Sequence, residues 1–256
     1  MITKDRFIAI VMTVIVWGLA GGVFGALFAG LYEVLSALGL SGWQPLVAAA
    51  GTAGMITSAL YSSMPVALTG AMAGVLASIG TLIALGQGAG LYAIAGIAAL
   101  AGVAGGGFYA WMADSHGQPL VETLVGLGSG LIAGTLVAVL VALTGHGAGT
   151  FWLAAGVVAV VGASFQISQR WLATVGSDWV HGGLSAAVVA GLTAVLVGAS
   201  IWVLAGTSAL SIDGGTADAM GQLRHEIAPG FVGGLIGSAL TGLILELLGF
   251  HLEDHA

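Results

Sequence analysis

The chain has no cysteine, and lysine and arginine together occupy only four of its 256 positions. The absence of thiols excludes disulfides, thiolate metal sites, iron–sulfur clusters and covalently attached c-type haem. The single lysine, Lys4, excludes a phosphate-binding P-loop and a retinal Schiff base inside a membrane. With a formal net charge of -7, the chain also lacks the basic surface that binds nucleic acid or anionic lipid headgroups.

Residues that carry redox or hydrolytic chemistry are also scarce. The six histidines fall in expected connections or near helix ends, which excludes a transmembrane b-type haem. No G-x-S-x-G nucleophile motif occurs in the sequence. We therefore expect no cofactor, and an enzyme ranks third among the functional hypotheses.

What the chain has in abundance is apolar sequence. Its mean hydropathy is +1.09, and only 6% of its residues are charged, against roughly 25% in an ordinary soluble domain. A membrane-crossing helix needs about 20 mostly apolar residues, so this length supplies about seven or eight crossings. We predict one all-α integral membrane domain over residues 1–256, a polytopic bundle in the lipid bilayer.

Eight helices are expected between the clusters of proline, glycine, serine and charge. They are Phe7 to about Glu33, Pro45 to Tyr61, Pro65 to Gly86, Leu91 to Met112, Pro119 to Thr144, Phe151 to Gln169, Gly182 to Gly206 and Pro229 to Phe250. All four prolines then fall in a first helical turn, where proline is tolerated. The charged segment 216–227 before the last helix is expected to be a solvated loop, with a helix on the membrane surface as the alternative.

The few basic residues indicate the orientation, because lysine and arginine near helix ends are retained on the cytoplasmic side. Lys4 and Arg6 place the N-terminus in the cytoplasm. In a topology of eight crossings, Arg170 then also lies on the cytoplasmic side, whereas Arg224 lies on the opposite side. A miscounted crossing, or a re-entrant hairpin near the break at residues 61–65, would change part of this topology. We expect an integral protein of the cytoplasmic membrane with a cytoplasmic N-terminus.

Forty-five glycines lie mostly inside the apolar segments, although a mid-helix glycine costs about 1 kcal/mol relative to alanine in water. In lipid, small residues four positions apart allow helix backbones to approach closely, so they indicate packing faces. A stripe of glycine that lines a conduit is the alternative. The glycines predicted to pack helices are Gly18, Gly22, Gly25, Gly126, Gly130, Gly134, Gly230, Gly234 and Gly237.

Two sequence similarities within the chain suggest internal duplication. Gln44-Pro45-Leu46-Val47 recurs as Gln118-Pro119-Leu120-Val121 at the start of another expected helix. Secondary transporters are often built from internal repeats, while a shared glycine-rich composition is the alternative explanation. The second similarity is a glycine spacing common to the first and last helices: Gly18, Gly21, Gly22, Gly25 and Gly30 match Gly230, Gly233, Gly234, Gly237 and Gly242.

Three glutamates are candidates for a transport or proton-relay role, because an ionisable group inside a membrane is costly and usually functional. Glu246 is expected to be the deepest, about 25 Å along its helix from Pro229. Glu33 should reach the far interface, and Glu122 lies near a helix start, where the helix dipole favours a carboxylate. The alternative for all three is an interfacial anchor or a helix-end charge.

The polar connections contain one further candidate site. Asp114 with His116, and Asp178 with His181, follow expected helices on the same predicted membrane face. Carboxylate and imidazole groups suit Zn²⁺ or a related first-row ion. These four residues are therefore candidate metal ligands, although such short patterns are more often ordinary polar loops.

The leading functional hypothesis is a multi-pass channel or secondary transporter for a small solute or ion. The alternative is a non-catalytic membrane subunit whose glycine faces dock other helices in a larger complex. Besides lipid, the expected partners are further copies of the chain or other membrane subunits. A transporter requires a polar site that includes a group such as Glu246, whereas a docking subunit requires glycine stripes that face outward.

Overall fold

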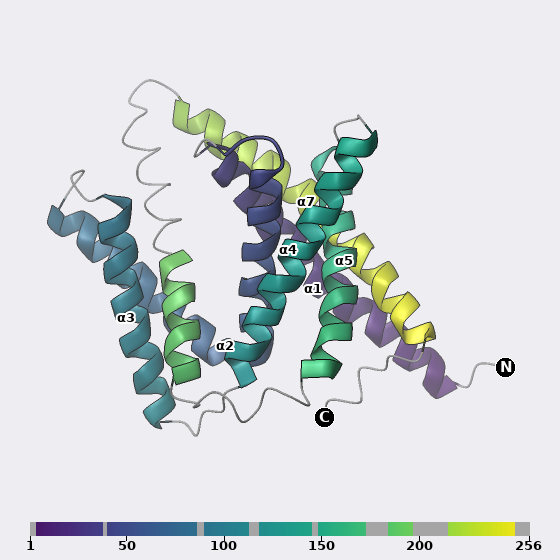
Figure 1. The fold of residues 1–256 in the computed structure, drawn as a ribbon, viewed down its shortest axis with the longest axis horizontal. Coiled ribbons are helices and arrows are strands. Elements are labelled where there is room, and N and C mark those ends of the chain that lie inside the picture. The colour runs from purple at the N-terminus through teal and green to yellow at the C-terminus, as the bar shows by residue number, and fades with distance from the viewer. Residues whose placement is uncertain are drawn as a thin grey trace. The chain divides into compact units, whose positions relative to one another are not determined.

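The expected helical fold class is confirmed. The computed structural model describes residues 4–37, 40–85, 90–112, 118–144, 148–172, 184–196 and 215–248, and no strand occurs among these residues. The helices are α1 (Lys4–Ala37), α2 (Gln44–Leu85), α3 (Leu91–Met112), α4 (Gln118–Thr144), α5 (Thr150–Leu172), a shorter helix Leu184–Leu196 and α7 (Gly215–Leu247), as Figure 1 shows.

Within these ranges, six helical segments are long and apolar enough to cross a membrane. They are Ile8–Ser36, Ser63–Leu85, Tyr92–Met112, Leu120–Thr144, Thr150–Ser168 and His225–Leu247. Each of the eight expected helices overlaps a described helix. The chain is therefore a multi-helix membrane protein, with six rather than eight spans identified by length and hydropathy in its described part.

The expected break between the second and third helices is a kink inside α2. Ser63 has non-helical dihedral angles (φ -156°, ψ 75°), and Pro65 follows two residues later. Pro45 and Pro119 lie in the first turns of α2 and α4, as predicted. The half of α2 before Ser63 is not among the six long apolar spans.

The expected start of the last helix at Pro229 is wrong. α7 begins at Gly215, so Pro229 lies inside it and the expected loop 216–227 is helical. Alanine, methionine, glutamine, leucine, arginine and glutamate are good helix formers and dominate this segment. Proline is tolerated within membrane helices because neighbouring groups satisfy the freed backbone carbonyls.

The chain divides into two compact units that are described separately. Unit 1 comprises Met1–Gly54, Leu127–Ser168 and Gly221–Ala256, and unit 2 comprises Met55–Gly126 and Gln169–Met220. Unit 1 thus contains α1, most of α7, most of α5 and parts of α2 and α4. Unit 2 contains the rest of α2, the start of α4, α3 and the helix Leu184–Leu196.

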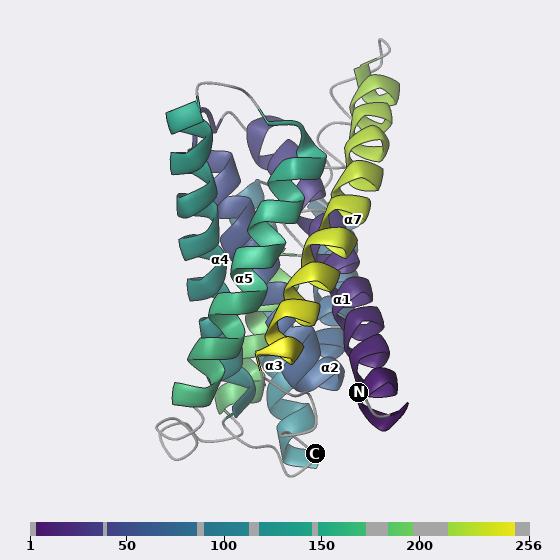
Figure 2. The same cartoon turned by 90° about the vertical axis from the view of Figure 1, so that its right-hand side faces the viewer.

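In unit 1, α1 and α7 run antiparallel along a glycine seam. Gly25 approaches Gly230 and Gly234, and Gly21 approaches Gly234 and Ser238. We call these five residues the α1–α7 seam. In Figures 1 and 2 the purple α1 and the yellow α7 lie side by side. A Cβ atom added to Gly25 would lie 2.9 Å from the Gly234 Cα atom, so the two backbones are nearly in contact.

The similar glycine spacing of the first and last helices therefore has a packing explanation. Gly18, Gly21, Gly22 and Gly25 are spaced by three, one and three residues, a pattern that is the same in both directions. Such a pattern suits a partner helix that carries the same spacing and runs antiparallel. On its other face α7 packs parallel to α5, where Gly233 meets Phe151 and Gly237 meets Ala155.

Unit 2 is packed around the helix Leu184–Leu196. On one side Gly70 and Gly74 of α2 meet this helix at Ala190 and Ala194, in the parallel direction. On the other side α3 meets it in the antiparallel direction: Gly102 approaches Ala190 and Ala194, and Gly106 approaches Ala186 and Ala190. In addition, the Ser185 Oγ atom accepts a hydrogen bond of 3.0 Å from the Leu120 N–H in the first turn of α4.

Candidate functional site

A buried carboxylate lies at one end of the α1–α7 seam. The Thr13 hydroxyl of α1 donates a hydrogen bond of 3.2 Å to the Glu246 Oε2 atom of α7, and the two residues are only 4% and 5% exposed. An interfacial anchor would keep its carboxylate in water, because burying a charge is costly unless the charge is paired. The burial of Glu246 between helices is therefore typical of a functional acid.

The depth that the sequence predicted for Glu246 needs correction. The apolar span of α7 runs from His225 to Leu247, so Glu246 lies one residue before its end. Thr13 is similarly five residues after the start of the α1 span at Ile8. The expected depth was counted from Pro229, which is not a helix start. The site is inside the protein but near one end of the span.

The Trp17 indole lies between α1, α5 and α7 on the seam side of Thr13. It lies one turn after Thr13 and packs against two glycines, Gly162 of α5 and Gly242 of α7. A Cβ atom on Gly162 would lie 2.7 Å from the Trp17 Cζ3 atom, and one on Gly242 would lie 2.7 Å from its Cγ atom. The missing side chains of these glycines therefore make the space that the indole fills.

Gly242→Ala is expected to displace Trp17. Because an overpacked site costs about 1–3 kcal/mol, the thermal unfolding midpoint in detergent should fall, and the tryptophan fluorescence spectrum should change. Combining it with Trp17→Leu should cost less than the sum of the two single changes, because residues in contact are not additive. Additive losses would show that the methyl group is accommodated elsewhere.

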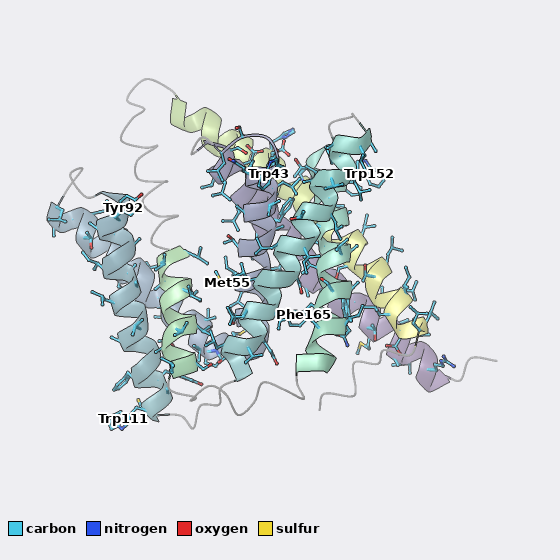
Figure 3. All side chains as sticks on the ribbon, in the orientation of Figure 1. Trp43, Met55, Tyr92, Trp111, Trp152 and Phe165 are labelled. Carbon is cyan, nitrogen blue, oxygen red and sulfur yellow. The ribbon has the colours of Figure 1, made fainter. Side chains whose placement is uncertain are left out.

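A second polar group lies at the opposite end of the same seam. Thr150 donates a hydrogen bond to Glu226, and the His225 Nδ1 atom lies 3.3 Å from the Glu226 Oε1 atom. Glu33 is close enough to Glu226 for the two charges to interact. Trp43 and Trp152, which are 64% and 70% exposed, lie at the helix starts of this end, as Figure 3 shows. Exposed indoles are typical of a headgroup interface.

Glu33 and Glu246, the two candidate glutamates of unit 1, lie at opposite ends of their helix pair. On α1, twenty residues separate Thr13 from Glu33, which is about 30 Å along a helix. The same separation holds on α7 between Glu226 and Glu246. Between these ends the α1–α7 seam consists of glycine, with Ser238 donating to the Trp17 carbonyl oxygen at 2.6 Å. Glu122 is buried in unit 2, close to the start of α4.

All nine glycines predicted to pack helices are buried. Besides those of the seam, Gly18 approaches Ala239, Gly22 approaches the Phe231 ring, and Gly237 approaches Ala155. On α4, Gly130 and Gly134 approach the backbone of α2 near Ala50 and Val47. For Gly126 only its burial is described.

Asp114, His116, Asp178 and His181, the candidate metal ligands, lie outside the described residues. In the part of the chain that is described, no group of three or more histidine, aspartate or glutamate side chains is arranged to hold a metal ion.

Comparisons with protein-family models, with curated proteins and with solved structures found no match for this chain. The functional argument therefore depends on the site itself.

Sequence reasoning identified Glu246 but missed its partner Thr13. A single threonine in an apolar helix carries no signal of its own, because threonine hydroxyls in helices commonly bond to the carbonyl one turn earlier. The contacts of Trp17 with Gly162 and Gly242 likewise depend on the packing of three helices, which no local pattern indicates. The glycine spacing shared by α1 and α7 was the one available sign that these helices are neighbours.

Proposed function

We propose that the chain is a secondary transporter that moves a small solute and uses Glu246 to bind and release a coupling proton. The observation that carries this proposal is the buried Thr13–Glu246 hydrogen bond at the junction of α1, α5 and α7. Ionisable groups buried in membrane proteins mark ion pathways and proton relays. The low charge of the apolar helices favours a neutral substrate.

The packing between the two acidic ends favours a carrier over an open channel. A proton or ion that moves along a fixed path needs polar groups or water at short intervals. The α1–α7 seam between Glu246 and Glu226 is instead closed by near contact of glycine backbones. A group at one end of such a seam exchanges with the far side only when helices move, which is the behaviour of alternating access.

We further propose that the segment containing α1 and α2 and the segment containing α3, α4 and α5 are two copies of one repeat. Gly21 and Gly25 of α1 pack against α7. The residues 81 positions later, Gly102 and Gly106 of α3, pack in the same way against the helix Leu184–Leu196. The tripeptide Leu19-Ala20-Gly21 recurs at the same separation as Leu100-Ala101-Gly102.

Other packing positions have the same separation. Gly70 and Gly74 of α2 contact the helix Leu184–Leu196. The residues 81 positions later, Phe151 and Ala155 of α5, contact α7. The repeated Gln-Pro-Leu-Val segments lie between these positions, 74 residues apart. These shared roles support duplication better than the glycine similarity of α1 and α7, which is explained by their mutual packing.

This proposal includes eight membrane crossings, with the chain reversing direction at the Ser63 kink. Each repeat then crosses the membrane three times. Because three is an odd number, the two copies enter the membrane from opposite faces. The cysteine-free chain allows a direct test with Trp43→Cys, Tyr92→Cys and Trp111→Cys, three exposed positions at helix ends. A membrane-impermeant maleimide should label the first two variants from the same side of the membrane and the third from the other side. Labelling of Trp43→Cys and Tyr92→Cys from opposite sides would mean that α2 crosses only once.

The docking-subunit alternative requires glycine faces that point outward, whereas the nine predicted packing glycines are buried. The deciding experiment has two parts. Native mass spectrometry of the gently extracted protein should find the chain alone or as a homo-oligomer. In proteoliposomes with an entrapped pH dye, a panel of small neutral solutes should include one whose gradient drives proton movement. A stoichiometric foreign subunit and no proton movement would favour the docking role instead.

A further inference from the structure

The proposed repeat provides an internal comparison for the Thr13–Glu246 site. Unit 1 and unit 2 each contain a glycine-bearing helix that packs antiparallel on a partner, α1 on α7 and α3 on the helix Leu184–Leu196. With the separation of 81 positions, Thr13 of α1 corresponds to Ile94 of α3. Ile94 is fully buried in unit 2. An apolar side chain thus fills the corresponding place in the other unit, and helix packing there needs no hydroxyl.

The partner position differs as well. On the helix Leu184–Leu196, the residues that contact α3 are Ala186, Ala190 and Ala194. The residues of α7 that make the equivalent contacts with α1 lie 44 positions later, at Gly230, Gly234 and Ser238. The residue that corresponds to Glu246 is then Trp202, which lies outside the described residues. Neither the acid nor its hydroxyl donor is repeated.

The direction of the Thr13 hydrogen bond separates it from most other hydroxyls of the helices. Thr81, Thr193 and Thr241 donate to the backbone carbonyl four residues earlier in their own helices. Thr13 uses its single hydroxyl proton for Glu246 on another helix.

We infer that Thr13 is a positioning residue that holds the Glu246 carboxylate and sets the pH at which it exchanges protons. This inference depends on the proposed role of Glu246. A hydrogen bond donated to a carboxylate favours its ionised form.

Other charged residues flank this site in the sequence. On α1, Arg6 lies two turns before Thr13 and is exposed. Lys4 and Asp5 precede it, Arg170 follows the apolar span of α5, and His251, Glu253, Asp254 and His255 follow α7 in the sequence. These groups remain unchanged in the variants below, so a shift among the variants reports on Thr13. An Arg6→Gln variant measures how much that cation contributes.

Thr13→Val should shift the midpoint of the pH dependence of proton-coupled flux upward by about one pH unit. Infrared titration of the protonated carboxyl band, which needs no transport, should show the same shift in the purified protein. Thr13→Ser keeps the hydroxyl and should leave the midpoint unchanged. Thr241→Val, a buried threonine of α7 that bonds within its own helix, is the matched control and should also cause no shift.

The outcomes separate this inference from the proposed function. An unshifted midpoint in Thr13→Val, with coupled flux abolished in Glu246→Gln, would overturn the role of Thr13 and retain the transporter. Full coupling in Glu246→Gln would overturn the proposed function itself. If Thr13→Val does not fold, Thr13→Ala makes the same test with a smaller side chain. A shift in Thr13→Ala that Thr13→Ser does not share would then support the inference.

Discussion

Replacing Glu246 with glutamine is expected to abolish proton-coupled solute movement while the protein still folds. Glutamine has nearly the shape of glutamate, and its carbonyl oxygen can accept the hydrogen bond from Thr13. It cannot bind or release a proton, so only the coupling step is removed. In proteoliposomes with an entrapped pH dye, a solute gradient that acidifies or alkalises wild-type vesicles should leave Glu246→Gln vesicles at the level of protein-free liposomes.

The matched controls for this prediction are the other two candidate acids. Glu33 lies at the opposite end of unit 1, close enough to Glu226 for their charges to interact. Glu122 is buried in unit 2, one turn after the start of α4. Glu33→Gln and Glu122→Gln should therefore retain coupled flux, with Glu122→Gln affecting stability instead. Equal loss of flux in all three variants would mean that no single acid is the coupling site.

Much of the helical structure followed from hydropathy and local punctuation. The expected helix Leu91 to Met112 coincides with α3, and the starts of α2 and α4 lie within one residue of those expected. These boundaries are set by short-range effects, namely the end of apolar sequence and the fixed φ angle of proline. Pro229 was misleading because the residues before it form helix well enough to continue α7 through the proline.

The contacts of the site could be predicted much less well, because they depend on which helices are neighbours. An acid in an apolar segment is conspicuous, so Glu246 was found. Its partner Thr13 is 233 positions away, and no local pattern joins the two. Once α1 is placed antiparallel to α7 through Gly21 and Gly234, the same register brings Thr13 to the last turns of α7. Sequence alone left this packing open, since the shared glycine spacing is equally compatible with duplication.

The α1–α7 seam is expected to be the part of unit 1 least tolerant of added volume, and Gly25→Ala tests this. The new methyl carbon would lie 2.9 Å from the Gly234 Cα atom and closer still to the Gly230 carbonyl oxygen, so two backbones would have to separate. Overpacking of this kind costs about 1–3 kcal/mol. Alanine recovers only about 1 kcal/mol through its better helix propensity. The thermal midpoint in detergent, followed by size-exclusion chromatography after heating, should therefore fall.

Gly80→Ala is the control for this change, because the same methyl group is added to a helix at a position with no atom within 4 Å. Its thermal midpoint should stay the same or rise slightly, since only the helix propensity changes. Separation of α1 from α7 also moves Thr13 relative to Glu246, so Gly25→Ala should weaken coupled flux along with stability, whereas Gly80→Ala should weaken neither. If Gly25→Ala were as stable as wild type, the helices would not be in backbone contact, and the seam could not be the closed barrier that the carrier mechanism requires.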